Sequence, residues 1–129
     1  MVGRKRLVAV VLSLLMWPTA SVSAQTMDVV KSESCGCCGL WLRHIETNGF
    51  KPTARNVALG ELARIKAAAG LKPDLQSCHT GRIAGYVIEG HVPAQDIKRL
   101  IAEKPDAIGL TVPGMPLGSP GMESGDRRE

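Results

Sequence analysis

The chain has 129 residues, a formal net charge of +4 at pH 7, 44% hydrophobic residues and only 3% aromatic residues. This length fits one domain rather than two, and the ordinary apolar fraction argues against wholesale disorder. So few aromatic side chains predict a modest core built mainly from Ala, Val, Ile and Leu.

The N-terminus has the three parts of a secretory signal peptide. A basic stretch at residues 4–6 precedes an apolar run from Leu7 to Trp17, and the small residues Val22 and Ala24 supply a cleavage site. The apolar run is shorter than the ~20 residues of a stable transmembrane helix, so an uncleaved anchor is the less favoured alternative. We therefore predict a signal peptide over residues 1–24, a periplasmic mature chain, and no membrane association after cleavage.

Removal of this segment also removes most of the positive charge. Three of the 16 basic residues leave with it and all 12 acidic residues stay, so the net charge falls to +1. The remaining basic residues are scattered and are not interleaved with aromatic residues. The composition therefore argues against nucleic acid as a partner.

Hydrophobic periodicity predicts alternating strands and helices along the mature chain. Strands are predicted over residues 27–31, 50–57, 82–89 and 108–112, and helices over 38–48, 59–69 and from Pro93, as first helical residue, to just before Pro105. Residues 91–92 either start a return strand or lead into the last helix. Residues 113–123 contain three prolines and three glycines and are expected to form a loop across the domain surface. This order favours one α/β domain over residues 25–123, followed by a disordered tail over 124–129.

The four cysteines all lie in the predicted exported part. Cys35, Cys37 and Cys38 crowd into a predicted loop over residues 32–39, and Cys78 lies in a second loop over 72–80. At most one long-range disulfide can form, and a bridge from Cys37 to Cys35 or Cys38 would close a small strained ring. A helix N-terminus stabilises thiolates, which are both nucleophiles and soft metal ligands. The pattern favours metal or redox chemistry, and a domain held by disulfides alone remains the structural alternative.

The type of ligand indicates which metal is preferred. Structural zinc sites usually use paired C-x2-C ligands, and the C-x-C-C spacing here differs from that pattern. Crowded thiolates suit Cu(I), which we predict first, with zinc second. His79, beside Cys78, is either a ligand or a polar loop residue. His91 either binds metal or makes a supporting hydrogen bond, and Met115 and Met122 either bind metal or pack on the core.

Two residues of the first predicted helix are assigned other roles. His44 lies six residues after Cys38, which is about 9 Å along a helix, so it is predicted to be a surface or packing residue. Trp41 is predicted to lie in the core one turn from the cysteines, where it shields them from water.

Four segments resemble the CopG-type periplasmic copper-resistance proteins: residues 34–41 (SCGCCGLW), 77–80 (SCHT), 85–93 (GYVIEGHVP) and 112–123 (VPGMPLGSPGME). The resemblance covers residues 27–123. It implies a thioredoxin-like fold, with a small central sheet flanked by about three helices and the C-x-C-C motif where thioredoxins carry C-x-x-C. It also implies a copper site, multinuclear and cysteine-bridged, on Cys35, Cys37, Cys38 and Cys78, with His79 beside them.

Two functions follow from these observations. The first is a periplasmic protein that binds Cu(I) in copper tolerance or copper redox handling, with copper ions and other copper-handling proteins as partners. The second is a thiol–disulfide oxidoreductase, although the C-x-C-C spacing leaves its attacking and resolving thiols unassigned. Enzymatic activity is therefore left open, and no residue pattern indicates hydrolytic catalysis.

Overall fold

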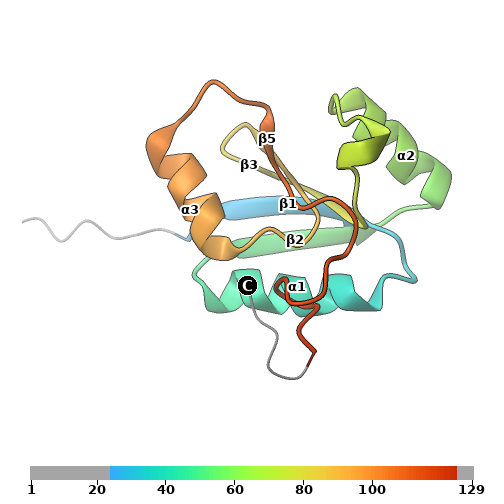
Figure 1. Ribbon diagram of the computed structural model, residues 1–129, viewed down its shortest axis with the longest axis horizontal. Coiled ribbons are helices and arrows are strands. Elements are labelled where there is room, and N and C mark those ends of the chain that lie inside the picture. The colour runs from blue at the N-terminus through green and yellow to red at the C-terminus, as the bar shows by residue number, and fades with distance from the viewer. Residues whose placement is uncertain (1–23, 125–129) are drawn as a thin grey trace, which may run out of the picture.

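The computed structural model describes residues 24–124, which form a five-stranded sheet and three α-helices (Figure 1). The predicted signal peptide, apart from Ala24, and residues 125–129 lie outside the described residues. The strands are β1 (Thr26–Lys31), β2 (Lys51–Asn56), β3 (His79–Ile83), β4 (Tyr86–Glu89) and β5 (Gly109–Thr111). The helices are α1 (Gly36–Thr47), α2 (Leu59–Ala68), α3 (Ala94–Glu103) and a short 3-10 helix, η1 (Pro73–Leu75). The mixed α/β class is confirmed, and the thioredoxin-like assignment stays an implication of the resemblance. Within residues 24–124, no helix combines the length and apolar character needed to cross a membrane.

The strand order β2-β1-β3-β4-β5 brings separate chain segments to one end of the sheet. β1 is parallel to β2 and β4 is parallel to β5, whereas β3 is antiparallel to both β1 and β4. The last residue of β1, Lys31, therefore pairs with the first residue of β3, His79, and Thr80 pairs with Glu89 at the end of β4. As a result, the segments after β1, before β3 and after β4 all meet at this end.

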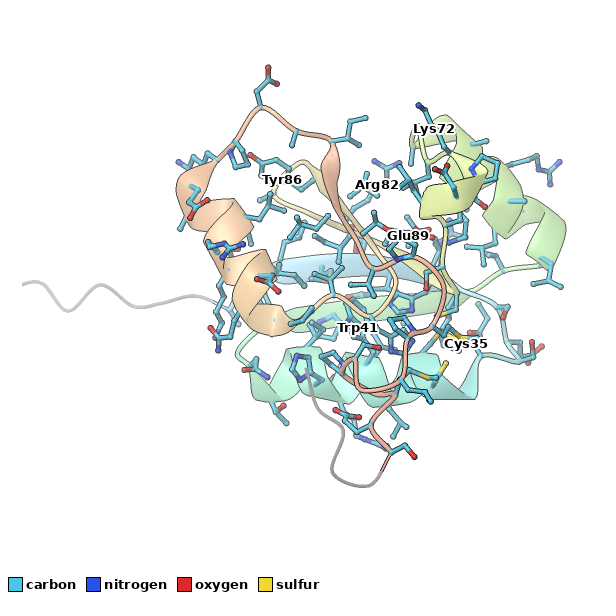
Figure 2. The ribbon with its side chains drawn as sticks, in the orientation of Figure 1. Cys35, Trp41, Lys72, Arg82, Tyr86 and Glu89 are labelled. Atoms are coloured by element: carbon cyan, nitrogen blue, oxygen red, sulfur yellow. A yellow bond between two sulfur atoms is a disulfide. The ribbon has the colours of Figure 1, made fainter. Side chains whose placement is uncertain are left out.

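The two faces of the sheet differ in what covers them. One face carries the core, in which Met27 and Val29 of β1 pack with residues of α1 and α3 such as Trp41 and Ile97. Figure 2 shows Trp41 on the α1 side of the sheet. On the other face, the buried Lys66 of α2 contacts Thr80 of β3 and Glu89 of β4. Because core side chains come from α1, the start of that helix is held firmly against the sheet.

The predicted strand over residues 82–89 is wrong, because the chain reverses in the middle of it. Ile83 pairs with Tyr86 across a two-residue turn, and Ala84 and Gly85 have φ angles of 50° and 85°. Two positive φ values are the signature of a type I′ hairpin turn. The apolar alternation continues through so short a turn, so periodicity alone does not reveal it.

Two predicted helix starts are also shifted. α1 begins at Gly36 rather than Cys38, so Cys35 is its N-cap and Cys37 and Cys38 lie in its first turn. The glycines at the start of the motif have poor helix propensity, but the burial of Cys38 and Trp41 outweighs that preference. α3 begins at Ala94, with Pro93 as its N-cap. The segment at 91–92 therefore leads into a helix and does not start a strand.

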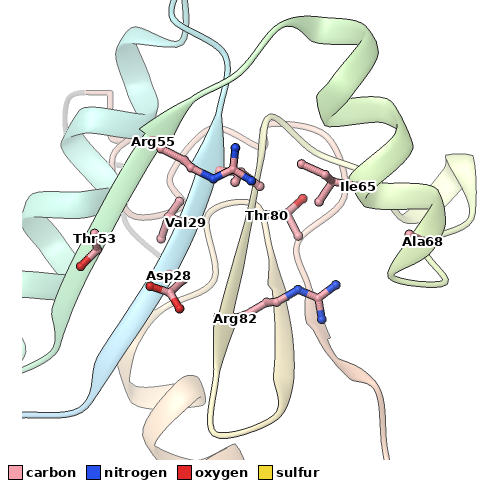
Figure 3. A pocket seen from close by; sticks show the side chains of 9 residues that line it. Asp28, Val29, Thr53, Arg55, Ile65, Ala68, Thr80 and Arg82 are labelled. Atoms are coloured by element: carbon pink, nitrogen blue, oxygen red, sulfur yellow. The ribbon is translucent and has the colours of Figure 1, made fainter.

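A pocket of about 460 Å³ opens on the α2 side of the sheet. Figure 3 shows Asp28, Arg55 and Arg82 on neighbouring strands, with Ile65 of α2 across the pocket. Its lining contains no cysteine and no histidine. This pocket is therefore separate from the cysteine cluster.

Candidate metal centre

The four cysteine sulfurs meet at the end of the sheet where β1 ends and β3 begins. Cys35, Cys37 and Cys38 come from the start of α1, and Cys78 comes from the residue before β3. All four Sγ atoms lie within 4.8 Å of one another. The antiparallel pairing of β1 with β3 explains why residues 40 positions apart in the chain come together here.

Two of these cysteines are bonded to each other. Cys35 and Cys38 form a disulfide, whereas Cys37 and Cys78 are free thiols. The helical first turn places the N-cap residue and the residue three positions later side by side, with a Cα–Cα distance of 5.5 Å. This bridge is not among the sequence-based predictions, which considered only strained local bridges from Cys37, because the helix was expected to begin at Cys38 and to leave Cys35 outside its first turn. A ligand role for Cys35 and Cys38 therefore requires the reduced protein.

Cys37 and Met115 form the solvent side of the cluster. The Cys37 Sγ lies 3.7 Å from the Cys35 Sγ and 3.8 Å from the Met115 Sδ. Met115 is 52% exposed, so its thioether lies between the cysteines and solvent. Met122 is half-buried, and its backbone closes a turn with Gly118 and Ser119. Within residues 24–124, no cysteine thiol donates a hydrogen bond to the Met122 sulfur.

Cys78 also belongs to a second group, which it forms with two histidines. Its Sγ lies 3.3 Å from the His79 Nδ1 and 3.2 Å from the His91 Nε2. One potential ligand atom from each of the three residues lies within 4.8 Å of the others. The structure thus brings both predicted histidine candidates to Cys78, because His79 starts β3 and His91 follows β4.

The orientation of His91 leaves one nitrogen free for the site. Its Nδ1 lies 2.7 Å from the Pro120 carbonyl oxygen, which can only accept a hydrogen bond, so Nδ1 donates. In the neutral ring, the Nε2 lone pair then faces the Cys78 sulfur at 3.2 Å. Metal-binding histidines commonly donate their second ring N–H to a carbonyl in this way.

His79 is a buried, neutral imidazole. Burial, the neighbouring His91 and the Lys66 ammonium lower the pKa of His79 to about 3. Its ring packs on Trp41 with a centroid distance of 4.2 Å, and its Nε2 has no hydrogen-bond partner among the described residues. A neutral imidazole keeps the lone pair that metal coordination needs.

Burial also affects Cys78. Burial raises the pKa of the Cys78 thiol above its ordinary value. A hydrogen bond from Ser77 opposes this shift, and the neighbouring Cys37 thiol adds to it. Cys78 is therefore a protonated thiol at neutral pH when no metal is bound. Metal binding at Cys78 must release this proton, so the metal affinity should fall as the pH is lowered.

The titration of His79 leads to a prediction for the metal-free protein. Its pKa is about 3 in the folded state, against the ordinary histidine value of 6.5 in the unfolded chain, so between these values the unfolded chain binds the proton first. The stability that the neutral His79 contributes is therefore fully present above pH 6.5 and is lost as the pH falls toward 3. We expect this residue to lower the free energy of unfolding by about 2 kcal/mol between pH 7 and pH 5. Urea unfolding at both pH values, compared with His79→Gln, measures the difference; an equal decrease in both proteins would contradict it.

A buried ion pair supports the loop that carries Cys78. Lys66 of α2 and Glu89 of β4 form a salt bridge, with side chains 5% and 0% exposed. Thr80 Oγ1 lies 2.9 Å from the Lys66 Nζ and donates to the Glu89 carboxylate at 2.6 Å. The Ser77 backbone N–H donates to the same carboxylate at 2.8 Å, which fixes the residue before Cys78.

This buried network is not among the sequence-based predictions, although the sequence carries a signal for it. Lys66 lies four residues after Leu62 and three before Ala69, on the buried side of its helix. Glu89 likewise ends a strand whose other inward positions are apolar. A charged residue on an apolar face is rarely buried without a partner, so each of these residues indicates a buried partner of opposite charge.

Residues 113–123 form a loop across the domain surface, as predicted, and this loop packs beside the site. Gly114 pairs with the segment before β3: its carbonyl accepts from the Ser77 hydroxyl, and its N–H donates to the Gln76 carbonyl at 3.1 Å. Further on, a Cβ at Gly121 would lie only 2.8 Å from the Trp41 backbone nitrogen. The loop therefore packs closely on α1 and needs glycine at this contact.

His44 has the packing role predicted for it. Its Nε2 accepts the Ala94 N–H at 3.0 Å, which satisfies a free donor at the start of α3. Burial lowers the pKa of His44, and the Glu123 carboxylate partly opposes this shift. The residue joins α1 to α3 and is not part of either ligand group.

Comparisons with known proteins place this geometry in a family. Residues 75–122, which contain Cys78, His79 and His91, match the family described as "Protein of unknown function, DUF411". A comparison with curated proteins gives no match. Two solved structures of a copper resistance protein, copG, are similar to the chain at 47% identity. Form 2 has a TM-score of 0.74 and the match covers 82% of this chain and 83% of that one; form 1 has 0.76 and 82% of each. The chain therefore belongs to the CopG family of copper resistance proteins.

Proposed function

We propose that this protein is a periplasmic copper-binding protein that holds Cu(I) on the thiolates of Cys35, Cys37, Cys38 and Cys78. The observation that carries the proposal is the convergence of all four Sγ atoms within 4.8 Å. Thiolates are soft ligands that select Cu(I), and sulfurs this close can bridge neighbouring ions in a multinuclear cluster. The similarity to solved copper resistance proteins supports the choice of copper.

The chain's own residues would divide the work at this site. Reduction of the Cys35–Cys38 disulfide would supply two of the four thiolates. His79 and His91 lie beside Cys78 and would add imidazole nitrogens as ligands. The exposed Met115 would offer a thioether sulfur on the solvent side of the cluster, where ions enter. Met122 has less support as a ligand, because among the described residues a cysteine thiol contacts the sulfur of Met115 and none hydrogen-bonds to that of Met122.

Metal analysis of the exported protein tests this proposal. The full chain is expressed in bacteria grown with copper, and the protein is purified from the periplasmic fraction under reducing conditions. We expect a chain that begins at Gln25, contains at least one copper per chain, and shows sulfur scattering in X-ray absorption. The Cys35/Cys37/Cys38→Ser triple variant should lose nearly all of this copper.

Two controls separate ligand loss from misfolding. His44→Gln lies on the same helix outside the ligand groups and should keep full copper content. The near-UV circular dichroism of Trp41 reports whether the triple variant keeps its core. A folded triple variant with unchanged copper stoichiometry would refute the copper proposal, and retention in the cytoplasm with residues 1–24 intact would refute export.

A thiol–disulfide oxidoreductase is the second candidate, and the Cys35–Cys38 pair favours it. With the disulfide at the helix N-terminus, the spacing becomes C-x-x-C, with Cys35 half-buried and Cys38 fully buried. The accessible Cys35 thiolate would attack a substrate disulfide, and Cys38 would resolve the mixed disulfide. The substrate then leaves as two thiols and the Cys35–Cys38 bond re-forms, with a dithiol such as dithiothreitol as reductant.

Insulin reduction by the metal-free protein distinguishes this candidate. If it is correct, turnover is abolished in Cys35→Ser and retained in Cys37→Ser, because only the first removes the attacking thiol. Turnover no faster than with dithiothreitol alone would exclude an oxidoreductase role and leave the copper proposal intact.

A further inference from the structure

Cys78 is the one cysteine shared by two groups of potential ligands. One group contains all four cysteines, and the other contains Cys78, His79 and His91. The Cys35–Cys38 disulfide removes two thiols from the first group and none from the second. We infer that the disulfide form keeps a separate one-ion site on Cys78, His79 and His91 for a divalent metal of borderline softness, with Zn(II) as the best match. This inference rests on the proposed ligand role of Cys78 but not on copper.

The distances in this group suit a single tetrahedral ion. The Cys78 Sγ lies 3.3 Å from the His79 Nδ1 and 3.2 Å from the His91 Nε2. An ion with Zn–S and Zn–N bonds of ordinary length separates its sulfur and nitrogen ligands by about 3.5 Å. The side chains therefore need to move by only a few tenths of an ångström to accommodate an ion.

Two imidazole rings face the same sulfur atom in this group. The Cys78 thiol has one proton, and it faces nitrogens from two imidazole rings. The His91 Nδ1 donates to the Pro120 carbonyl, so in the neutral ring the Nε2 accepts from the Cys78 thiol. The His79 Nδ1 lies at hydrogen-bond distance from the same sulfur, whereas the atom of this buried ring without a partner among the described residues is Nε2, which is not the atom that faces the sulfur. An ion that replaces the proton binds all three residues at once.

The ligand types select the class of metal. One thiolate and two neutral imidazoles form a mixed sulfur–nitrogen set of the kind that zinc accepts. Three protein ligands leave a fourth tetrahedral position for water or another donor. The four-sulfur group is softer and suits Cu(I) in the reduced protein. The state of the disulfide would thus decide which of the two groups binds metal.

Titration of the disulfide form with Zn(II) and Co(II) tests this inference. The exported full-length protein is stripped of metal with a chelator under non-reducing conditions, and two free thiols confirm that the disulfide is intact. We expect one Zn(II) per chain and a tetrahedral Co(II) spectrum with a thiolate charge-transfer band. Cys78→Ser and His91→Gln should each weaken Zn(II) binding by at least about 10-fold.

The matched control is the Cys35→Ser/Cys38→Ser double variant. It lacks the disulfide and both its thiols but keeps the second group, so its Zn(II) affinity should equal that of the disulfide form. Absence of Zn(II) binding by the disulfide form would overturn the inference, as would binding unchanged in a folded Cys78→Ser variant. Copper loading of the reduced protein without Zn(II) binding by the oxidised one would refute this inference alone. Zn(II) binding by the oxidised protein, without copper loading of the reduced protein, would refute only the proposed copper function.

Discussion

Replacement of Glu89 by Leu is expected to lower the free energy of unfolding by about 3–5 kcal/mol. The substitution leaves the buried Lys66 ammonium without its carboxylate and removes the acceptor of the Ser77 N–H. An uncompensated buried charge is among the most destabilising changes a single substitution can make. For a domain of this size, the melting temperature should fall by at least about 12 °C, measured by thermal unfolding of the metal-free protein.

An exposed ion pair on the same molecule provides the matched control. Arg55 and Glu61 lie 3.3 Å apart with side chains 62% and 45% exposed, so Glu61→Leu should cost less than about 1 kcal/mol. The Lys66→Met/Glu89→Leu double variant should recover most of the lost stability, because it removes both buried charges. Equal effects of Glu89→Leu and Glu61→Leu would show that the buried pair does not support the fold.

Reduction of the Cys35–Cys38 disulfide is expected to raise the affinity for Cu(I) by more than about 100-fold. Loss of a single supporting partner at a metal site typically costs 10–100-fold, and the disulfide removes two direct ligands of the proposed cluster. The metal-free protein should titrate as two thiols, Cys37 and Cys78, before reduction and as four afterwards. Competition with a Cu(I)-specific chelator, before and after reduction, measures the change in affinity.

A variant without this redox pair isolates the effect. Cys35→Ser/Cys38→Ser should bind Cu(I) as weakly as the disulfide form and should not respond to reductant. If its affinity matched that of the reduced natural chain, Cys35 and Cys38 would not be ligands. The proposed cluster would then be limited to Cys37, Cys78 and the neighbouring histidines and methionine.

Local sequence patterns predicted most of the elements. The β-branched run after Met27 gives β1, and the apolar spacing at Leu62 and Ala69 gives α2, with Gly70 in the left-handed conformation after it. β2 lies at the edge of the sheet, which accommodates the proline near its start because proline has no N–H to donate to a neighbouring strand. Patterns of this kind succeed because helix and strand periodicity are local properties of the backbone.

The hairpin at Ala84 and Gly85 shows where local patterns fail. Apolar residues alternate on both sides of the turn, so one long strand and two short ones have the same periodicity. Only the pairing of Ile83 with Tyr86 distinguishes them, and it depends on contacts with neighbouring strands. This error concealed the antiparallel return that brings His91 back to Cys78.

The chemistry of the site follows from residue types alone: four soft sulfur ligands, three of them crowded just before a predicted helix, and an imidazole beside the fourth. How these residues are divided into groups depends on the folded chain. Helical geometry paired Cys35 with Cys38, and antiparallel pairing of β3 placed Cys78 among the other sulfurs and beside His91. The sequence determines the ligand chemistry because each residue type has its own chemical preference. The grouping of the ligands needs the tertiary structure, because sulfur–sulfur and sulfur–nitrogen distances depend on strand order and on packing between distant segments.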